Sequence, residues 1–262
     1  MTADNSINIT QDDHIQEDYM QEDYTQEDYA QRIMVALDYS DEQEARILLT
    51  KLQGIPCYMK VGLQLFYAAG PRFIVYLKEQ GYKVFLDVKM HDIPNTVKGG
   101  SESVTRLGVD MFNVHAAGGR RMMEAALEGV DKAAANSQIR PLVIGVTQLT
   151  STDQEMLNSE IGIPGEMEEA VLRYATLAAA SGLDGVVASP WEVSQIKAAI
   201  RPSFITVTPG IRPLGTDIGD QARIMTPQQA FAQGSEFIVI GRPITASPNP
   251  RAALEQIIKE LV

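Results

Sequence analysis

Cysteine is nearly absent from this sequence of 262 residues, which contains only Cys57. A single cysteine cannot form an intramolecular disulfide, and it argues against a zinc site built from thiolates. Cys57 lies in an apolar stretch, so we expect a small buried side chain at this position. The sequence also lacks an apolar run long enough to span a bilayer, and we therefore expect no membrane partner.

Basic residues are missing from residues 1–30, which carry nine of the 34 acidic residues. This segment has neither the basic region of a secretory signal nor the arginines of an organellar transit peptide, so a cytoplasmic protein is the simplest expectation. The other 25 acidic residues lie in residues 31–262 together with all 22 basic residues. Because that part is nearly neutral, it lacks the positive field that attracts duplex nucleic acid, and we expect no nucleic-acid partner.

The motif QEDY begins at residues 16, 21 and 26 and forms a repeat with a period of five. This period matches neither the 3.6 of a helix nor the 2 of a strand, so no face of a regular element becomes apolar. High charge with little aliphatic content is typical of disorder, and we predict that residues 1–30 form a disordered acidic tail. The alternative is a docking segment anchored by Tyr19, Tyr24 and Tyr29.

Short apolar runs follow one another from residue 32 to the end of the chain. Runs of this kind are typical of strands that are buried on both faces of a parallel sheet. The predicted strands are residues 33–38, 57–62, 83–89, 110–115, 141–146, 185–189, 204–210 and 237–241.

Amphipathic helix patterns separate these strands. Ser40 and Gln43 have the spacing of a capping box, and Asn249 before Pro250 predicts the start of the last helix. Trp191 is predicted to be a packing residue. Eight β-then-α units over residues 31–262 indicate a single-domain (β/α)8 TIM barrel of the α/β class. An open doubly wound sheet is the alternative, but the first strand is not followed by a Gly-rich dinucleotide turn.

Several predicted strands end in charged residues, where packing alone would not select them. Asp38 ends the first strand, Lys60 lies in the second, Asp87 and Lys89 lie in the third, and Asp92 follows. In a barrel these ends meet at the face that carries function. A structural network of ion pairs is the alternative, but buried ion pairs are poor stabilisers because desolvation offsets the Coulomb attraction. The pattern therefore favours catalysis.

The opposite side of the same rim has the features of a phosphate site. Barrels often bind phosphate with the loops after strands seven and eight. The seventh strand leads into the long Gly- and Pro-rich segment TPGIRPLGTDIGDQAR, which is a candidate lid. After the eighth strand, Gly241 allows close approach of an anion and Arg242 supplies a guanidinium that can bind it.

The segment FLDVKMHDIPNT at residues 85–96 resembles the signature of the orotidine 5′-monophosphate decarboxylase family, whose core is D-x-K-x-x-D. The segments VALD, KVG, NVHAAGG, VTQLTS, SGLDGVV, TVTPGIR and VIGR also occur in the family's order. Together they cover residues 32–262, and only the acidic tail falls outside the resemblance.

The resemblance implies an enzyme that decarboxylates orotidine 5′-monophosphate to UMP, with no metal and no cofactor. It implies that Lys89 is the proton donor to C6 of the pyrimidine and that Asp87 lies against the substrate carboxylate. Asp38 and Lys60 are implied to hold ribose hydroxyls, while Lys60 also completes the charged network.

The resemblance also implies a homodimer, because Asp92 and Thr96 reach into the active site of the neighbouring subunit in this family. Thr150 is implied to contact the pyrimidine ring, and Gln221 to bridge the base and the phosphate. The residues implied to hold the phosphate and the closed loop are Arg212, Gln221, Gly241 and Arg242.

Three other interpretations compete with this one. His91 and His115 suggest a metal site, but they lie on different segments without a ligand-spaced motif and are more often structural. A magnesium-dependent sugar-phosphate enzyme on the same barrel shares the D-x-K-x-x-D core, although VTQLTS and the GIR segment favour a nucleotide. A binding protein without catalysis would not need Asp87 and Lys89, and both are present.

Overall fold

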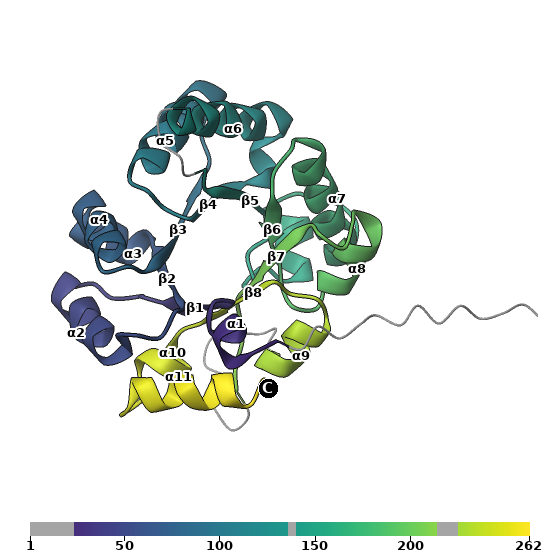
Figure 1. The fold of residues 1–262 in the computed structure, drawn as a ribbon. Helices are drawn as coiled ribbons and strands as arrows, with labels where there is room; N and C mark the ends of the chain where they lie inside the picture. Colours follow the sequence, from purple (N-terminus) through teal and green to yellow (C-terminus); the bar gives the residue numbers. More distant parts are fainter. Residues whose placement is uncertain (1–23, 136–139, 214–224) are drawn as a thin grey trace, which may run out of the picture.

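The computed structural model describes residues 24–135, 140–213 and 225–262. Eight parallel strands close into one barrel in the order in which they occur along the chain, and helices surround it (Figure 1). Pairing of Val35 with Ile240 joins the last strand to the first. The predicted (β/α)8 barrel is confirmed. The strands are β1 (Ile33–Ala36), β2 (Tyr58–Gly62), β3 (Lys83–Met90), β4 (Met111–His115), β5 (Leu142–Val146), β6 (Gly185–Val187), β7 (Ile205–Thr208) and β8 (Phe237–Ile240).

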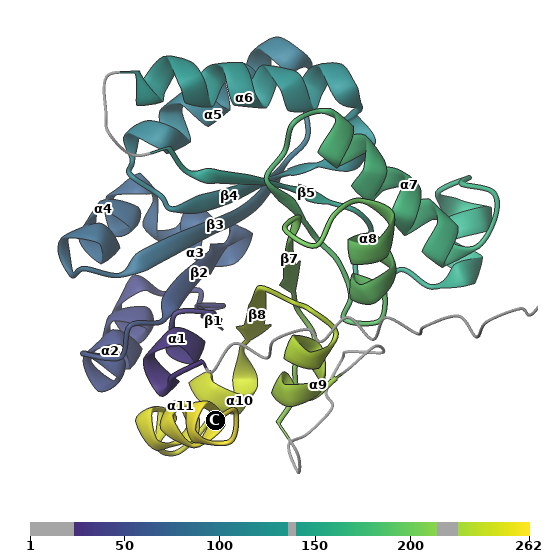
Figure 2. The same ribbon diagram turned by 45° about the vertical axis from the view of Figure 1, so that its right-hand side comes forward.

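The helices form an outer ring in which α5 and α6 lie side by side (Figure 2). Gly129 of α6 permits this close approach, because a Cβ atom there would lie 2.2 Å from the carbonyl oxygen of Lys98 in α5. The α-helices are α1 (Gln26–Ala30), α2 (Glu42–Leu52), α3 (Leu63–Ala69), α4 (Pro71–Glu79), α5 (Pro94–Arg106), α6 (Arg120–Ala134), α7 (Met167–Ala180), α8 (Val193–Ala199), α9 (Pro227–Ala232), α10 (Arg242–Thr245) and α11 (Pro250–Lys259). A 3₁₀ turn (Ala116–Gly118) follows β4, and a π-helical turn (Met156–Glu160) precedes α7.

Of the two helix starts predicted from capping residues, one is confirmed and one is shifted by a residue. The Asn249 side chain caps α11 as predicted, with its oxygen 3.2 Å from the backbone nitrogen of Ala252. Helix α2 begins one residue later than predicted, because Asp41 and not Ser40 accepts the hydrogen bond from the Gln43 backbone. The prediction for Trp191 is wrong, since 61% of its surface is exposed. No helix in the described ranges has the length and apolar character needed to cross a bilayer.

The last QEDY repeat forms helix α1, although residues 1–30 were predicted to be disordered. Thr25 begins this helix because its hydroxyl accepts a hydrogen bond from the Asp28 backbone, while the Asp28 carboxylate accepts one from the Thr25 backbone. Such a capping box stabilises the first turn of a short helix. Residues 26–30 of the predicted tail are therefore helical. Tyr19 and the other residues of 1–23 lie outside the described residues.

Helix α1 is held to the barrel through Arg32. The Arg32 guanidinium lies 4.5 Å from the ring centroids of both Tyr24 and Phe231, and the ring of Tyr29 lies 5.3 Å from that of Phe231. Cation–π contacts of this geometry stabilise by about 0.5–1 kcal/mol each at exposed sites. Of the proposed anchors, Tyr29 thus contacts Phe231 of α9, and Tyr24 contacts Arg32.

An acidic residue stands directly before β4, β6 and β8 and accepts a hydrogen bond from the backbone of the preceding strand. Asp110 binds the Val84 nitrogen at 2.7 Å, Asp184 binds the Val143 nitrogen at 2.7 Å, and Glu236 binds the Thr206 nitrogen at 2.6 Å. Each acid also pairs with a cation: Lys78, Arg140 and Lys197, respectively. We call these three groups the base clamps, since they lie at the amino-terminal end of the barrel.

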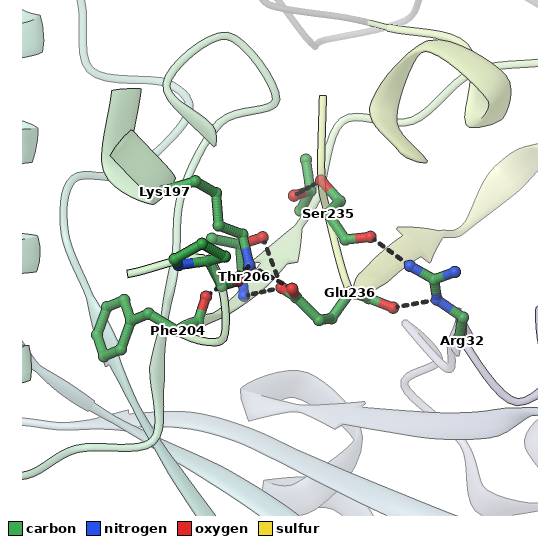
Figure 3. Close-up of polar contacts among 8 residues, drawn as sticks. Arg32, Lys197, Phe204, Thr206, Ser235 and Glu236 are labelled. Atoms are coloured by element: carbon green, nitrogen blue, oxygen red, sulfur yellow. Dashed lines mark hydrogen bonds and ion pairs between the residues drawn. The ribbon is translucent and has the colours of Figure 1, made fainter. Parts of the chain in front are cut away.

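The third base clamp also joins β8 to β1 (Figure 3). The Lys197 ammonium binds Glu236 and donates to the Phe204 carbonyl at 2.7 Å. Arg32 donates to the backbone carbonyls of Glu236 and Ser235 at 3.0 and 2.9 Å. The amino-terminal face of a TIM barrel generally serves stability, and this arrangement of charges fits that role.

The interior of the barrel changes from apolar to polar along the strands. Tyr58, Phe85 and Met111 pack together in a buried cluster inside the barrel. Side chains two residues apart on a strand point to the same side. The residue two positions after each of these three therefore also points into the barrel, one level closer to the carboxyl ends of the strands. At that level the side chains are polar and largely buried: Lys60, Asp87 and Asn113.

Candidate active site

Four charged side chains meet at the carboxyl ends of β1, β2 and β3, with acids and bases in alternation. The Lys60 ammonium lies 2.8 Å from Asp38 Oδ1 and 3.7 Å from Asp87 Oδ2. The Lys89 ammonium lies 2.7 Å from Asp87 Oδ1. We call these four residues the charged array. The sequence predicted their proximity from strand position alone, and the structure brings all four together.

The members of the charged array differ in solvent exposure, from the mouth of the barrel to its interior. The side chains of Asp38 and Lys89 are 58% and 29% exposed, whereas those of Lys60 and Asp87 are 10% and 13% exposed. Burial raises the pKa of Asp87, but the charges of Lys60 and Lys89 and two hydrogen bonds outweigh it, so its pKa lies below the ordinary value. Asp87 is therefore an anion at neutral pH, placed between two cations.

Asn113 is a member of the site that the sequence reasoning missed. Its side chain is fully buried in β4, where its amide nitrogen donates to Asp87 Oδ1 at 2.7 Å. Its amide oxygen accepts from the backbone N–H of Lys89, also at 2.7 Å. The signal was present in the sequence, because Met111 and Asn113 share one face of a strand and only the first is apolar.

The backbone of Lys89 is unusual. Its φ angle of 49° is the one positive value among non-glycine residues in the described ranges. The pairing of β3 with β4 is also irregular between Leu86 and Met90. Irregularities of this kind redirect a side chain at the end of a strand, and a non-glycine residue with positive φ often marks a functional position.

Gly62 leaves room for the charged array, and Gly241 lies next to it. A Cβ atom on Gly62 would lie 3.2 Å from the Lys60 ammonium and 3.5 Å from Asp38 Oδ1. A Cβ atom on Gly241, at the end of β8, would lie 4.0 Å from Asp38 Oδ2. The predicted phosphate position is thus adjacent to the array, since Gly241 and Asp38 are neighbours across the β8–β1 junction.

The remaining predicted phosphate residues lie after β7 and β8. Arg212 is 8% exposed, and its backbone N–H donates to the Met225 carbonyl at 2.9 Å. Arg242 is exposed and begins α10 directly after Gly241. Thr150 follows β5 and is half-buried at the same face of the barrel. Gln221 lies outside the described residues.

Asp92 and Thr96 do not join the charged array of their own chain. Both are exposed, and the Asp92 carboxylate accepts a hydrogen bond from the Ile93 backbone at 2.6 Å. Ile93, between them, is also 67% exposed although it is a large apolar residue. This exposed segment directly follows β3, so it stands beside the array without contributing to it.

The two histidines beside the array are packed against each other. The ring centroids of His91 and His115 lie 5.3 Å apart. Burial, the neighbouring His91 and the Lys89 charge all lower the pKa of His115, which favours its neutral form. Across residues 24–135, 140–213 and 225–262, no group of three or more His, Cys, Asp or Glu side chains is arranged to hold a metal ion.

A closed parallel barrel with charged residues gathered at the carboxyl ends of its strands is the arrangement of a (β/α)8 barrel enzyme. Residues 31–257 match the family model described as "Orotidine 5′-phosphate decarboxylase / HUMPS family". The chain belongs to this family.

Known relatives are similar over nearly the whole barrel. A protein of Moorella thermoacetica named Orotidine 5′-phosphate decarboxylase is 51% identical over 231 residues, which cover 88% of this chain and 92% of that protein. A protein of Bacillus mycoides with the same name is 49% identical over 227 residues, covering 87% and 95%. The crystal structure of Orotidine 5′-phosphate decarboxylase from Lactobacillus acidophilus has a TM-score of 0.79 at 42% identity, covering 88% of this chain and 99% of that chain.

Proposed function

We propose that this chain decarboxylates orotidine 5′-monophosphate to UMP and carbon dioxide, the last step of de novo pyrimidine nucleotide synthesis. The observation that carries the proposal is the Lys89 ammonium, held 2.7 Å from Asp87 at the mouth of the barrel. The family match over residues 31–257 and two relatives of about half identity, named for this reaction, support it.

The proposed chemistry requires a cation at a fixed position. Loss of carbon dioxide from C6 leaves an electron pair in an sp² orbital that no ring carbonyl can delocalise. The Lys89 ammonium stabilises that charge and then transfers a proton to C6, so one group acts as electrostatic stabiliser and general acid. Because the ammonium is already paired with Asp87, little reorganisation is needed when the carbanion forms.

Asp87 and Lys60 support this role in different ways. Asp87 faces the substrate carboxylate and holds the Lys89 ammonium in place through the ion pair at 2.7 Å. Lys60 lies between Asp38 and Asp87 and prevents the two acids from facing each other without a cation. Asp38 and Lys60 are proposed to hold the ribose hydroxyls.

Binding of the phosphate is proposed to supply energy remote from C6. Gly241 and Arg242, directly after β8, are proposed to bind the phosphate together with Arg212 and Gln221 of the segment after β7. Thr150, which follows β5, is proposed to contact the pyrimidine ring. Residues 214–224 of the segment after β7 lie outside the described residues; their closure over the substrate is proposed to exclude water and to strengthen the electrostatic effect of Lys89. A guanidinium binds phosphate more directionally than an ammonium, which suits Arg242 to this position.

The complete site is proposed to form in a homodimer. Asp92 and Thr96 are exposed and separate from the array of their own chain, as expected for residues that serve a neighbouring subunit. The exposed Ile93 side chain between them offers apolar surface for such a contact. The reaction needs no metal or cofactor in this proposal, and the cytoplasmic location expected from the sequence remains part of it.

The reaction is tested by following the ultraviolet absorbance of orotidine 5′-monophosphate after addition of the purified protein in EDTA. We expect the absorbance to fall as UMP forms, and chromatography to recover UMP in equal amount. Activity that appears only with magnesium and a sugar-phosphate acid would instead assign the chain to the metal-dependent chemistry considered above.

A further inference from the structure

Asn113 connects Asp87 and Lys89 of the charged array through opposite ends of one amide. The amide nitrogen donates to Asp87 Oδ1 at 2.7 Å, and the amide oxygen accepts from the Lys89 backbone nitrogen at 2.7 Å. Its side chain is fully buried in β4, on the inner face of the barrel. A buried amide with both ends bonded has one orientation and little freedom to move.

Only one orientation of the Asn113 amide fits its neighbours. A carboxylate can only accept hydrogen bonds, and a backbone N–H can only donate. If the amide were turned by 180°, its oxygen would face the Asp87 carboxylate and its NH₂ group would face the Lys89 N–H. Leucine of similar size would satisfy neither partner, and aspartate would satisfy the N–H alone.

The hydrogen bond from the Lys89 backbone to Asn113 forms where the backbone of β3 is irregular. Lys89 has a φ angle of 49°, and the pairing of β3 with β4 is irregular between Leu86 and Met90. A left-handed residue of this kind is held only where its surroundings compensate for the backbone strain. The Asn113 oxygen is the acceptor for the Lys89 N–H at this irregular position.

We propose that Asn113 is a positioning residue for the decarboxylation. It holds the Asp87 carboxylate through one bond and the strained Lys89 backbone through the other, and so fixes the direction of the Lys89 ammonium relative to C6. The inference rests on the proposed function, in which Lys89 delivers the proton. Asn113 carries no charge and contributes by orientation alone.

The test compares Asn113→Ala and Asn113→Asp with wild type and with Val114→Ala. Val114 is the next residue of β4 and is fully buried in the core cluster between strands and helices, so its truncation weakens packing without touching the array. For each variant kcat, KM, the Kd of UMP and the melting temperature are measured, with kcat determined across a range of pH.

We expect Asn113→Ala to lower kcat by about 100-fold, since a small displacement of a reacting group has an effect of that order. The Kd of UMP is expected to stay within about threefold of wild type, because the residues proposed to bind the phosphate follow β7 and β8 and are remote from β4. Val114→Ala is expected to lower the melting temperature with kcat within about twofold of wild type. This split between kcat and UMP binding distinguishes positioning from a general loss of stability.

The pH profile supplies a second readout that a structural role would not change. In Asn113→Asp a carboxylate faces Asp87, and like charges raise the pKa of the pair. Below that pKa the shared proton restores a donor to Asp87, so kcat relative to wild type is expected to rise as the pH falls. Because this variant is nearly isosteric, it also serves if Asn113→Ala does not fold.

Two results would overturn the inference while leaving the proposed function intact: Asn113→Ala with kcat within about threefold of wild type, or an Asn113→Asp profile parallel to wild type. In both cases the Lys89→Ala variant, measured alongside, would still be inactive. Near-normal turnover in Lys89→Ala would contradict the proposed function itself, and the Asn113 inference with it.

Discussion

Asp87 keeps its charge inside the barrel because its surroundings offset the cost of burial. Lys60 and Lys89 face it as cations, and Lys89 and Asn113 donate hydrogen bonds to it. Removing one partner from such a group usually costs more than the pair contributes, since an uncompensated charge is left behind. The site is therefore sensitive to any change that moves Lys60 or Lys89, even by a few tenths of an ångström.

Gly62→Ala tests this sensitivity with a single methyl group. The φ angle of −88° suits alanine, but the new Cβ would lie 3.2 Å from the Lys60 ammonium and push it from its place between Asp38 and Asp87. We expect kcat/KM to fall by roughly tenfold, a loss of about 1.4 kcal/mol in transition-state binding. Steady-state kinetics with a melting curve check this, and unchanged kinetics would show that the array tolerates the shift.

His115 gives the folded protein a dependence on pH. Burial, His91 and Lys89 lower its pKa in the fold, while Asp87 opposes them, so the unfolded chain binds the proton more readily than the native one. Stability from this group is therefore complete above the ordinary value of 6.5 and is lost as the pH falls below it. Denaturant unfolding of wild type and His115→Gln from pH 5 to 8 is the measurement. Equal slopes for the two proteins would contradict this account.

Among the elements, the base clamps hold the amino-terminal ends of neighbouring strands together. Asp110, Asp184 and Glu236 occupy the same position before β4, β6 and β8, and each binds a backbone N–H of the strand before. Cys57 stands at the corresponding position before β2, where it is buried and burial raises its pKa to about 12. That thiol is therefore a neutral packing group.

Asp110→Ala separates stability from activity. The substitution leaves the Val84 N–H without its acceptor and Lys78 without its carboxylate, both in a partly buried site. We expect a loss of about 2–3 kcal/mol in the free energy of unfolding, because hydrogen bonds to charged groups are of that order. The clamp lies at the end of the barrel remote from the charged array, so kcat should change by less than about twofold. A large loss of kcat in the folded variant would contradict this division of roles.

The strands and their order could be predicted from sequence because each is a short apolar run bounded by turn residues. The charged array could be predicted too, since the ends of parallel strands converge in a barrel. The inward-facing polar position of Asn113 was visible in the sequence, but its two partners were not, because its bonds join β4 to β3 through contacts that a local pattern does not encode. Helix α1 could not be predicted, because it depends on Arg32 and Phe231, which lie far apart in the chain.

At the scale of the whole molecule, the exposed Asp92 and Thr96 lead to a prediction about assembly. Inactive Asp92→Ala and Lys60→Ala subunits are mixed under conditions that exchange them. Each hybrid dimer then contains one site with both residues intact, so random mixing should restore roughly a quarter of wild-type activity. Hybrid dimers verified by differential tagging but without activity would contradict a site shared between subunits.

The central claim is that the Lys89 ammonium, held by Asp87, delivers the proton to C6. Turnover of orotidine 5′-monophosphate and binding of UMP by the Lys89→Ala variant test it most directly. We predict that kcat falls by about 10³-fold or more while UMP still binds, because the substitution removes the general acid and leaves the residues proposed to bind the phosphate unchanged. Near-normal turnover by a correctly folded Lys89→Ala protein would contradict the account.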